Sequence, residues 1–218
     1  MQTPISYLIT SGVTTAQTTP ASEEFASILQ LVAAAVAANV SLIQIREKEL
    51  RARVLCELTT SAAALTRSSP TRLLVNDRAD IARATGADGV HLTTRSLAPD
   101  VVRRTFGPDF LIGVSTHSAA EARAAREAQA DFVVWGPVFA TESKRTHGEP
   151  LGTVGLYSVT KELAPFPVVA LGGITLDNAV ACFEAGASGI AGIRLFRDPE
   201  SLVELVNRIR KASRVTKQ

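Results

Sequence analysis

Cysteine is scarce in this sequence, and its spacing excludes one broad class of protein. The two cysteines, Cys56 and Cys182, lie far apart, each inside a segment of helical composition. Small secreted domains that depend on disulfides carry several closely spaced cysteines, and zinc sites built on cysteine need them in near pairs. The sequence therefore argues against a disulfide scaffold and against such a metal site. It indicates free, packed thiols in a reducing compartment.

Long apolar runs and clusters of one charge sign are also missing. No segment approaches the ~20 consecutive apolar residues that cross a bilayer, and the N-terminus lacks the charged and then apolar segments of a secretory signal. The formal net charge is only +2, and no basic run is interleaved with aromatic residues, which form 5% of the chain. These absences argue against a membrane protein and against nucleic-acid binding. We expect a cytoplasmic protein.

The sequence is rich in short apolar segments at regular intervals. Hydrophobic residues form 46% of the 218 residues, and no linker or low-complexity segment divides them, so we expect one domain over residues 1–218. Eight β-branched segments predict strands that start at Ile5, Ser41, Arg72, Gly89, Leu111, Asp131, Pro167 and Gly189. Helical patterns follow near residues 23–38, 51–67, 78–85, 98–105, 118–128, 153–163, 175–184 and 199–213, with Ser22, Ser118 and Thr175 among the N-caps.

The alternation of strands and helices predicts the fold class. Strands that are almost continuously apolar, each followed by a helix, form a parallel sheet that is covered on its outer face. Eight such units in a chain of 218 residues favour an α/β protein of the (β/α)8 TIM barrel type over an open doubly wound sheet, which is the alternative. Such barrels carry their chemistry at the carboxyl ends of the strands. The sequence is unusually polar at these positions.

The second predicted strand ends in the segment QIREK, which contains Gln44, Arg46 and Lys48. Side chains alternate along a strand, so these three are expected to point the same way. Two cations beside an amide suit a polyanion such as phosphate or pyrophosphate. The alternative is that Arg46 and Lys48 form ion pairs with carboxylates on the barrel rim, where such pairs contribute little to stability.

Glycines at the ends of the seventh and eighth strands predict a phosphate site. Gly172, Gly173 and Gly192 would let backbone N–H groups approach an anion closely. Barrels of this type usually bind phosphate at the loops after these two strands. The alternative for the glycine pair is a tight turn between strand and helix. Arg194 would either add its charge to the anion site or project into solvent.

The strand ends resemble those of a known family. The segments QIREK, VNDRADIA, GADGVHL, IGVSTHSAAEA, GPVFATESK, PLG and PVVALGGI, in this order, are similar to the thiamin phosphate synthase/TenI family. The resemblance covers nearly the whole chain between Gln44 and Ile193. It implies a (β/α)8 barrel that acts on thiazole and pyrimidine intermediates of thiamin synthesis.

In the synthase branch, the resemblance implies the joining of a pyrimidine methyl pyrophosphate to a thiazole phosphate with loss of pyrophosphate. The residues that match the pyrophosphate side of that branch are Gln44, Arg46, Lys48, Asn76 and Lys144. Those that match the thiazole phosphate side are Thr141, Ser143, Gly173 and the backbone of Ile193 and Arg194. Ser115 matches a position near the reacting pyrimidine, and Asp77 matches one magnesium ligand.

Two departures weaken the synthase interpretation. The second magnesium ligand of that branch belongs to a Gly-Gln-Glu-Asp segment, and this sequence has Thr93-Thr94-Arg95-Ser96 in its place. A hard divalent cation needs oxygen ligands, preferably anionic ones, so Ser96 is a poor substitute. Arg95 brings a positive charge close to the place of the metal. At the other side, Arg194 replaces a serine beside the thiazole phosphate.

A loop without acidic residues does fit the TenI branch. Its members resemble thiazole tautomerases, which move a proton on a carboxylated thiazole phosphate and need an acid/base group and an anion site but no metal. His117 matches the histidine of that role, and an imidazole titrates near neutral pH. The alternative for His117 is a helix cap or a supporting contact. We expect a TenI-like thiazole tautomerase that uses His117 and Ser115 as catalytic residues and requires no cofactor.

Two alternatives remain open. The QIREK segment and the pair Asn76 and Asp77 are more typical of a thiamin phosphate synthase, which would hold Mg²⁺ at Asp77. A non-catalytic protein that binds thiazole or thiamin phosphate would keep the anion site and lack the chemistry. In each case the expected partner is a small phosphorylated molecule rather than a nucleic acid or a membrane, and a homodimer is left open.

Overall fold

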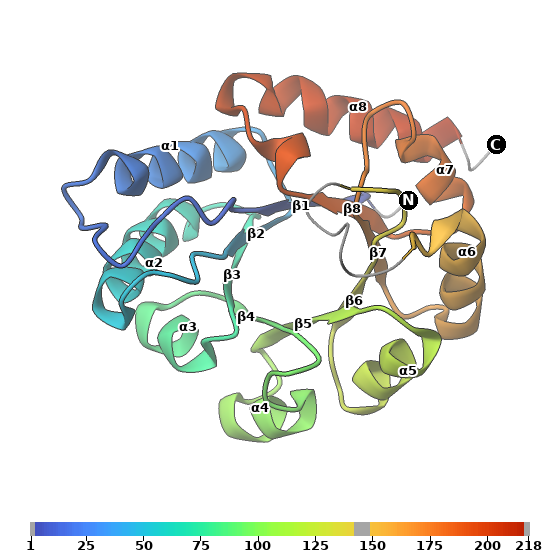
Figure 1. Cartoon of the computed structure of the whole chain (residues 1–218), viewed down its shortest axis with the longest axis horizontal. Helices are drawn as coiled ribbons and strands as arrows, with labels where there is room; N and C mark the ends of the chain where they lie inside the picture. The colour runs from blue at the N-terminus through green and yellow to red at the C-terminus, as the bar shows by residue number, and fades with distance from the viewer. Residues whose placement is uncertain (1–2, 142–148, 216–218) are drawn as a thin grey trace.

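Eight parallel strands form a closed barrel in the computed structural model, which describes residues 3–141 and 149–215 (Figure 1). The strands pair in sequence order, and the last pairs with the first. They are β1 Ile5–Ile9, β2 Leu42–Ile45, β3 Arg72–Asn76, β4 Gly89–Leu92, β5 Leu111–Thr116, β6 Phe132–Trp135, β7 Val168–Leu171 and β8 Gly189–Gly192. The predicted (β/α)8 barrel is therefore confirmed, and the open sheet is excluded.

Helices surround the barrel on its outer side (Figure 1). They are α1 Glu23–Ala37, α2 Ala52–Thr66, α3 Ala79–Thr85, α4 Pro99–Phe106, α5 Ala119–Glu127, α6 Gly152–Leu163, α7 Ala179–Glu184 and α8 Leu202–Val215. Two short 3-10 helices, η2 Arg194–Phe196 and η3 Pro199–Ser201, precede α8. Within the described ranges, none of the helices has the length and apolar character needed to cross a membrane.

Two helix starts differ from the prediction for local reasons. The α7 helix starts at Ala179 rather than near 175, and its N-cap is Asn178 rather than Thr175. The Asn178 Oδ1 atom accepts a hydrogen bond from the Thr175 N–H at 2.8 Å, and the Thr175 hydroxyl faces the Asn178 N–H at 3.4 Å, so residues 175–178 form a separate turn. The α8 helix starts at Leu202 because η3 occupies the three preceding residues.

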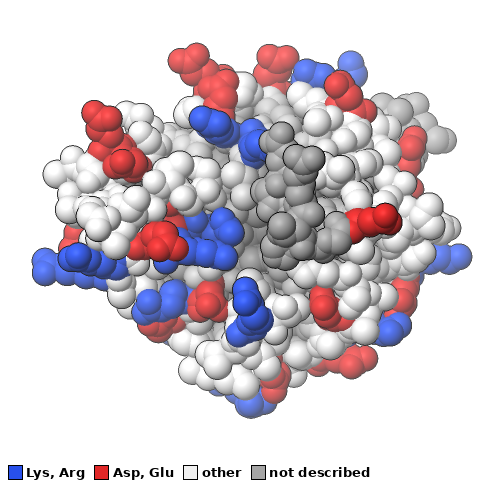
Figure 2. Space-filling model, viewed as in Figure 1, with Lys and Arg blue, Asp and Glu red and all other residues white. Residues whose placement is uncertain are grey.

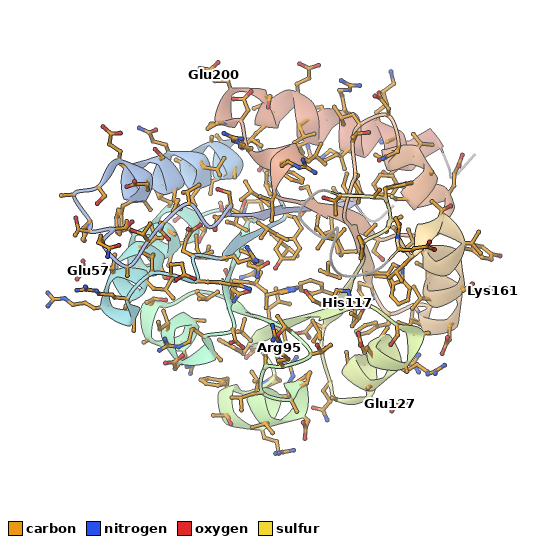
Figure 3. The ribbon with its side chains drawn as sticks, in the orientation of Figure 1. Glu57, Arg95, His117, Glu127, Lys161 and Glu200 are labelled. Atoms are coloured by element: carbon orange, nitrogen blue, oxygen red, sulfur yellow. The ribbon has the colours of Figure 1, made fainter. Side chains whose placement is uncertain are left out.

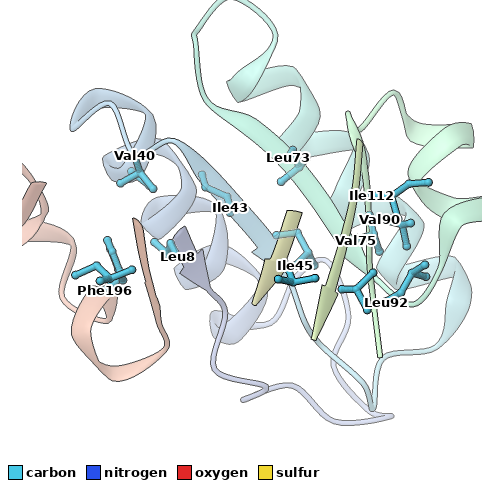
Figure 4. Packing of buried hydrophobic residues seen from close by; sticks show 14 of the residues in the cluster. Leu8, Val40, Ile43, Ile45, Leu73, Val75, Val90, Leu92, Ile112 and Phe196 are labelled. Atoms are coloured by element: carbon cyan, nitrogen blue, oxygen red, sulfur yellow. The ribbon is translucent and has the colours of Figure 1, made fainter. Parts of the chain in front are cut away.

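The apolar core has two layers. The larger lies between the barrel and its helices, and Figure 4 shows part of it, including Leu8, Ile43 and Val90. The smaller fills the inside of the barrel and consists of Tyr7, Ile9, Leu42, Leu74, Phe132, Val134, Val169 and Ala191. Strands buried on both faces explain the almost continuous apolar runs in the sequence. The filled interior confines ligand chemistry to the end of the barrel.

Phe196 provides a test of the outer layer. Its side chain is 0% exposed, and it is the last residue of η2, where it lies close to Gly192. Phe196→Ala should lower the free energy of unfolding by about 3–5 kcal/mol, the usual cost of removing a buried ring. Urea denaturation measures this loss. Val203→Ala is the control, because Val203 is 55% exposed, and it should change stability by less than about 0.5 kcal/mol. Equal losses in the two variants would contradict this packing.

Candidate active site at the carboxyl ends of the strands

Gln44 and Asn76 connect the barrel interior to its carboxyl end. Gln44 is 1% exposed, and its Nε2 donates to Asn76 Oδ1 at 3.1 Å. On its other side, Gln44 Oε1 accepts a hydrogen bond of 3.3 Å from the Tyr7 hydroxyl. Gln44 therefore faces the inside of the barrel and orients Asn76, which lies half-buried at the end of β3. The structure brings these two predicted site residues together.

Three cations gather on one side of this end. The pKa of the Lys48 ammonium is lowered, first by the nearby charge of Arg46, then by partial burial and by Arg95, whereas Asp77 and Glu49 act in the opposite direction. Figure 2 shows Lys and Arg side chains bordering a hollow near the centre of this face. Repulsion among like charges indicates a place built for an anion. We name Arg46, Lys48 and Arg95 the cationic group.

The rim ion-pair alternative gains no support. In the described ranges 3–141 and 149–215, the side-chain ion pairs within 4.0 Å involve neither Arg46 nor Lys48. Arg46 is instead fixed through its backbone, where its N–H donates to Thr10 Oγ1 at 2.8 Å. The charges of the cationic group are thus available to a bound anion.

Asp77 lies among these cations. Its backbone has a φ of 62°, and its N–H donates to the His91 carbonyl at 2.9 Å, which fixes the turn after β3. Its carboxylate is exposed, and its charge reaches Lys48. Over the described residues, no three His, Cys, Asp or Glu side chains gather in a way that could hold a metal ion. Asp77 is thus placed at the site without a supporting set of protein ligands.

Ser96 closes the loop after β4. Its Oγ accepts a hydrogen bond of 2.8 Å from the Thr93 N–H and lies 3.0 Å from Thr93 Oγ1. The Ser96 N–H donates in turn to the Thr93 carbonyl at 3.0 Å. Ser and Thr hydroxyls commonly stabilise turns in this way. The residue that replaces the acidic ligand of the synthase pattern therefore holds the turn that carries Arg95.

Polar side chains also cross the inside of the barrel. His91 is 3% exposed; its Nδ1 lies 3.1 Å from the Tyr7 hydroxyl, and its Nε2 lies 2.8 Å from Ser115 Oγ. Burial, and secondarily the charge of Arg46, lowers the pKa of His91 to about 3, so the ring is neutral at physiological pH. Burial also raises the pKa of Tyr7 well above its usual value, so the phenol keeps its proton.

His117 follows β5 and therefore lies at the carboxyl end of the barrel; Figure 3 labels its side chain. The ring Nδ1 of His117 lies 2.5 Å from the Gly136 carbonyl, and the backbone N–H of His117 donates to Glu121 Oε2 at 2.6 Å. A carbonyl only accepts, so the Nδ1 atom of His117 carries a proton. The α5 helix is capped by Ser118 instead, whose side chain accepts from the Glu121 N–H. His117 therefore joins the ends of β5 and β6.

The glycine pair after β7 lies against the loop after β6. Gly172 and Gly173 have φ values of 100° and 63°, and an added Cβ would lie 2.6 Å from Pro137 Cα and 2.5 Å from the Ala140 carbonyl oxygen, respectively. Only glycine fits such a left-handed, crowded backbone. The tight-turn alternative is therefore correct as the local reason for these glycines. It leaves their role in anion binding a prediction.

The loops after β6 and β8 meet beside this turn. Arg194 Nη2 donates to Thr141 Oγ1 at 3.1 Å. Ile193 is half-buried at the start of η2, and an added Cβ at Gly192 would lie 3.0 Å from Leu195 Cβ, so the turn after β8 is tight as well. Arg194 thus bonds to a loop neighbour rather than projecting only into solvent. Ser143 and Lys144 lie outside the described residues.

Glu47 is a residue whose role the sequence did not reveal. It is 3% exposed and accepts hydrogen bonds from Gly12 N–H at 3.1 Å, from Thr14 N–H at 3.2 Å and from the Thr14 hydroxyl at 2.8 Å. This carboxylate holds the long loop after β1 beside the cationic group. A possible signal was its place between Arg46 and Lys48, since alternation directs it to the opposite side.

Taken together, the anion-binding features define a class of protein. The mouth of a (β/α)8 barrel carries cations after β2 and β4 and a glycine turn after β7, which is the arrangement of barrel enzymes that act on phosphorylated small molecules.

Comparison with known proteins identifies the family. Residues 13–196 match the family model described as thiamine monophosphate synthase. A putative thiamine-phosphate synthase of Geobacter sulfurreducens is 45% identical over 174 residues, 79% of this chain and 81% of the relative. The thiamine-phosphate synthase of Moorella thermoacetica is 39% identical over 183 residues, 84% of this chain and 87% of the relative. A thiamine phosphate pyrophosphorylase from Pyrococcus furiosus superposes with a TM-score of 0.77 at 29% identity, covering 98% and 97% of the two chains.

The chain belongs to the thiamine monophosphate synthase family and is an enzyme of thiamin biosynthesis. The predicted family resemblance is confirmed. The preference for the TenI-like branch is not confirmed. These relatives give no support to a TenI-like tautomerase, and their names favour the synthase alternative.

Glu47 allows a test of how the mouth is held in place. Glu47→Ala removes the acceptor of three hydrogen bonds and should lower the free energy of unfolding by about 2–3 kcal/mol, because buried donors lose a charged partner. The amides of Gly12 and Thr14 should exchange with solvent faster. Urea denaturation and hydrogen exchange measure the two effects. Glu49→Ala, at an exposed neighbouring position, should change stability by less than about 0.5 kcal/mol. Unchanged exchange at Gly12 would contradict this role.

Proposed function

We propose that this enzyme is a thiamin phosphate synthase that couples a pyrimidine methyl pyrophosphate to a thiazole phosphate. The observation that carries the proposal is the presence of two separate places for an anion at one barrel mouth. One is the cationic group with Asp77, and the other is the glycine turn with Arg194 and Thr141. A tautomerase substrate carries one phosphate and one carboxylate, whereas a synthase binds a phosphate and a pyrophosphate, and three gathered cations match the higher charge of the pyrophosphate.

The cationic group is assigned to the pyrophosphate. Arg46 and Arg95 offer planar forks of N–H donors, and Lys48 adds a compact charge. When the bond between the methylene carbon and pyrophosphate breaks, the electron pair leaves with the pyrophosphate oxygen. Fixed positive charges stabilise that developing charge more effectively than they stabilise the bound substrate. Asn76, oriented by Gln44 at 3.1 Å, adds an amide donor on the same side.

Magnesium fits this place through one carboxylate. Mg²⁺ is commonly bound by one or two carboxylates together with substrate phosphates and water, and Asp77 is an exposed carboxylate beside Lys48. Asp77 would hold the ion, which would supply charge neutralisation to the pyrophosphate. Ser96 offers no negative charge to the ion, and its hydroxyl already bonds to Thr93. Arg95, on the same turn, supplies positive charge in place of a second metal ligand.

The thiazole phosphate is assigned to the other side. Gly173, Ile193, Arg194 and Thr141 lie on the loops after β6, β7 and β8, where barrels of this type usually bind phosphate. Ser115 is the penultimate residue of β5, two positions before His117, and is assigned to the pyrimidine. In this assignment, His117 positions the strand ends through its bond to Gly136 rather than moving a proton.

A coupling assay tests the proposed function directly. The purified protein, given pyrimidine methyl pyrophosphate, thiazole phosphate and Mg²⁺, should release pyrophosphate and form thiamin phosphate. A parallel reaction with the carboxylated thiazole phosphate tautomer should show no isomerisation above the uncatalysed rate. Isomerisation without coupling would replace the proposal with the tautomerase. Binding without either reaction would indicate a non-catalytic binding protein.

Arg95 provides a sharper test of the pyrophosphate side. Arg95→Gln should raise the KM for pyrimidine methyl pyrophosphate about tenfold, because a charged donor to an anion is lost, and should leave the KM for thiazole phosphate unchanged. Calorimetry with inorganic pyrophosphate in the presence of a chelator should show the same loss of affinity without metal. Arg67→Gln is the control, since Arg67 is the C-cap of α2 and lies at the opposite end of the barrel. An Arg95 variant with unchanged pyrophosphate affinity would remove this residue from the site.

A further inference from the structure

The polar side chains inside the barrel form a continuous chain of hydrogen bonds from β2 to β5. Gln44 Oε1 lies 3.3 Å from the Tyr7 hydroxyl, which lies 3.1 Å from His91 Nδ1; His91 Nε2 lies 2.8 Å from Ser115 Oγ. Tyr7 and His91 are 0% and 3% exposed, while Ser115 is half-buried at the carboxyl end. The buried part of the chain therefore ends at a residue that a ligand can reach.

Counting protons fixes the direction of every bond in this chain. Gln44 uses its Nε2 to donate to Asn76, so the atom that faces Tyr7 is the amide oxygen, which only accepts. The Tyr7 hydroxyl therefore donates its single proton to Gln44 Oε1. The Tyr7 oxygen must then accept a hydrogen bond from His91 Nδ1–H. A neutral imidazole has one N–H. Its Nε2 consequently accepts, and the donor to it is the Ser115 hydroxyl.

A glycine in the neighbouring strand makes room for this ring. Gly113 lies on β5 beside the imidazole, and an added Cβ would lie 2.9 Å from His91 Nδ1 and 2.3 Å from Phe132 Cζ. The Phe132 ring packs near both members of the buried pair, with ring centroids 5.8 Å from Tyr7 and 6.2 Å from His91. Glycine within a strand often marks a close approach of neighbouring groups. The imidazole is thus held in one orientation.

We propose that Tyr7 and His91 are positioning residues that turn the Ser115 hydroxyl proton inward, so that Ser115 presents only an acceptor to the bound substrate. The identity of that substrate rests on the proposed function: Ser115 would accept from an N–H or O–H group on the pyrimidine ring of the pyrophosphate substrate. Tyr7 and His91 touch no substrate. They determine specificity through Ser115. A ligand whose facing edge carries only acceptors would place its lone pairs against the lone pair of the Ser115 oxygen, and neither side would gain a hydrogen bond.

Nitrogen-15 NMR of the histidine rings tests the direction of the chain in the unliganded protein. The sequence has three histidines, and the signals that vanish in His91→Asn belong to His91. The expected state is a neutral ring protonated at Nδ1. A ring protonated at Nε2 would overturn the proposal, because Ser115 would then be free to donate to the ligand. This measurement needs no activity, so its failure is distinct from failure of the proposed function.

A double-mutant cycle tests the action through Ser115. Tyr7→Phe keeps the ring and removes the hydroxyl; it should raise the KM for the pyrimidine substrate about fivefold, with a smaller effect on kcat. Ser115→Ala should raise the same KM at least as much, and the double variant should equal Ser115→Ala, because Tyr7 then has nothing to orient. Additive effects would overturn the proposal.

Two controls separate positioning from stability. Tyr157→Phe removes a hydroxyl from a side chain that is 52% exposed on α6, and it should leave KM and kcat unchanged. Thermal unfolding of Tyr7→Phe shows whether the variant is folded at the assay temperature. If it is not folded, the nitrogen-15 signals of His91 in the otherwise unchanged protein still test the proposal, since they report the direction of the hydrogen bonds without any substitution at Tyr7.

Discussion

Closure of the barrel is the constraint on which the rest of the molecule depends. Pairing of β8 with β1 leaves no free sheet edge and brings the carboxyl ends of all the strands into one ring. The Tyr7 hydroxyl on β1 and His91 Nδ1 on β4 then lie 3.1 Å apart across the barrel interior. The helices contribute by burying the outer face of the strands, while the strand ends carry the chemistry. Because the paired strands fix where their following loops begin, charges on the loops after β2 and β4 are held close despite their repulsion.

The inside of the barrel links stability to the site. Buried polar groups are costly unless they are hydrogen-bonded, and Gln44, Tyr7 and His91 meet this requirement by bonding to one another. The chain they form leaves the interior at two points, Asn76 and Ser115. Satisfying the core therefore also orients two side chains at the mouth. The hydrogen bonds that satisfy the buried polar groups are thus the same bonds that orient Asn76 and Ser115.

The barrel and most of its strand ends could be predicted from the sequence, because strands buried on both faces produce apolar runs that are visible without any knowledge of partners. The starts of α7 and α8 could not, because they depend on a turn closed by Thr175 and Asn178 and on η3. The roles of Tyr7 and Glu47 could not be predicted from the sequence either. Their partners come from other strands or loops, and only the closed barrel brings these together.

Ser96 illustrates why a departure from a family pattern is ambiguous at the level of sequence. In the sequence, Ser96 stands where the synthase branch has an acidic metal ligand, and its presence favoured an enzyme that needs no metal. In the structure its hydroxyl closes the turn that carries Arg95, so the loop keeps an electrostatic role with the sign of its charge reversed. Under the proposed function, an arginine beside Lys48 in place of acidic residues would move the neutralisation of the pyrophosphate from bound metal toward the protein itself. The same electrostatic requirement of the substrate can thus be met by a different set of residues, and this is consistent with membership of the family despite the altered loop.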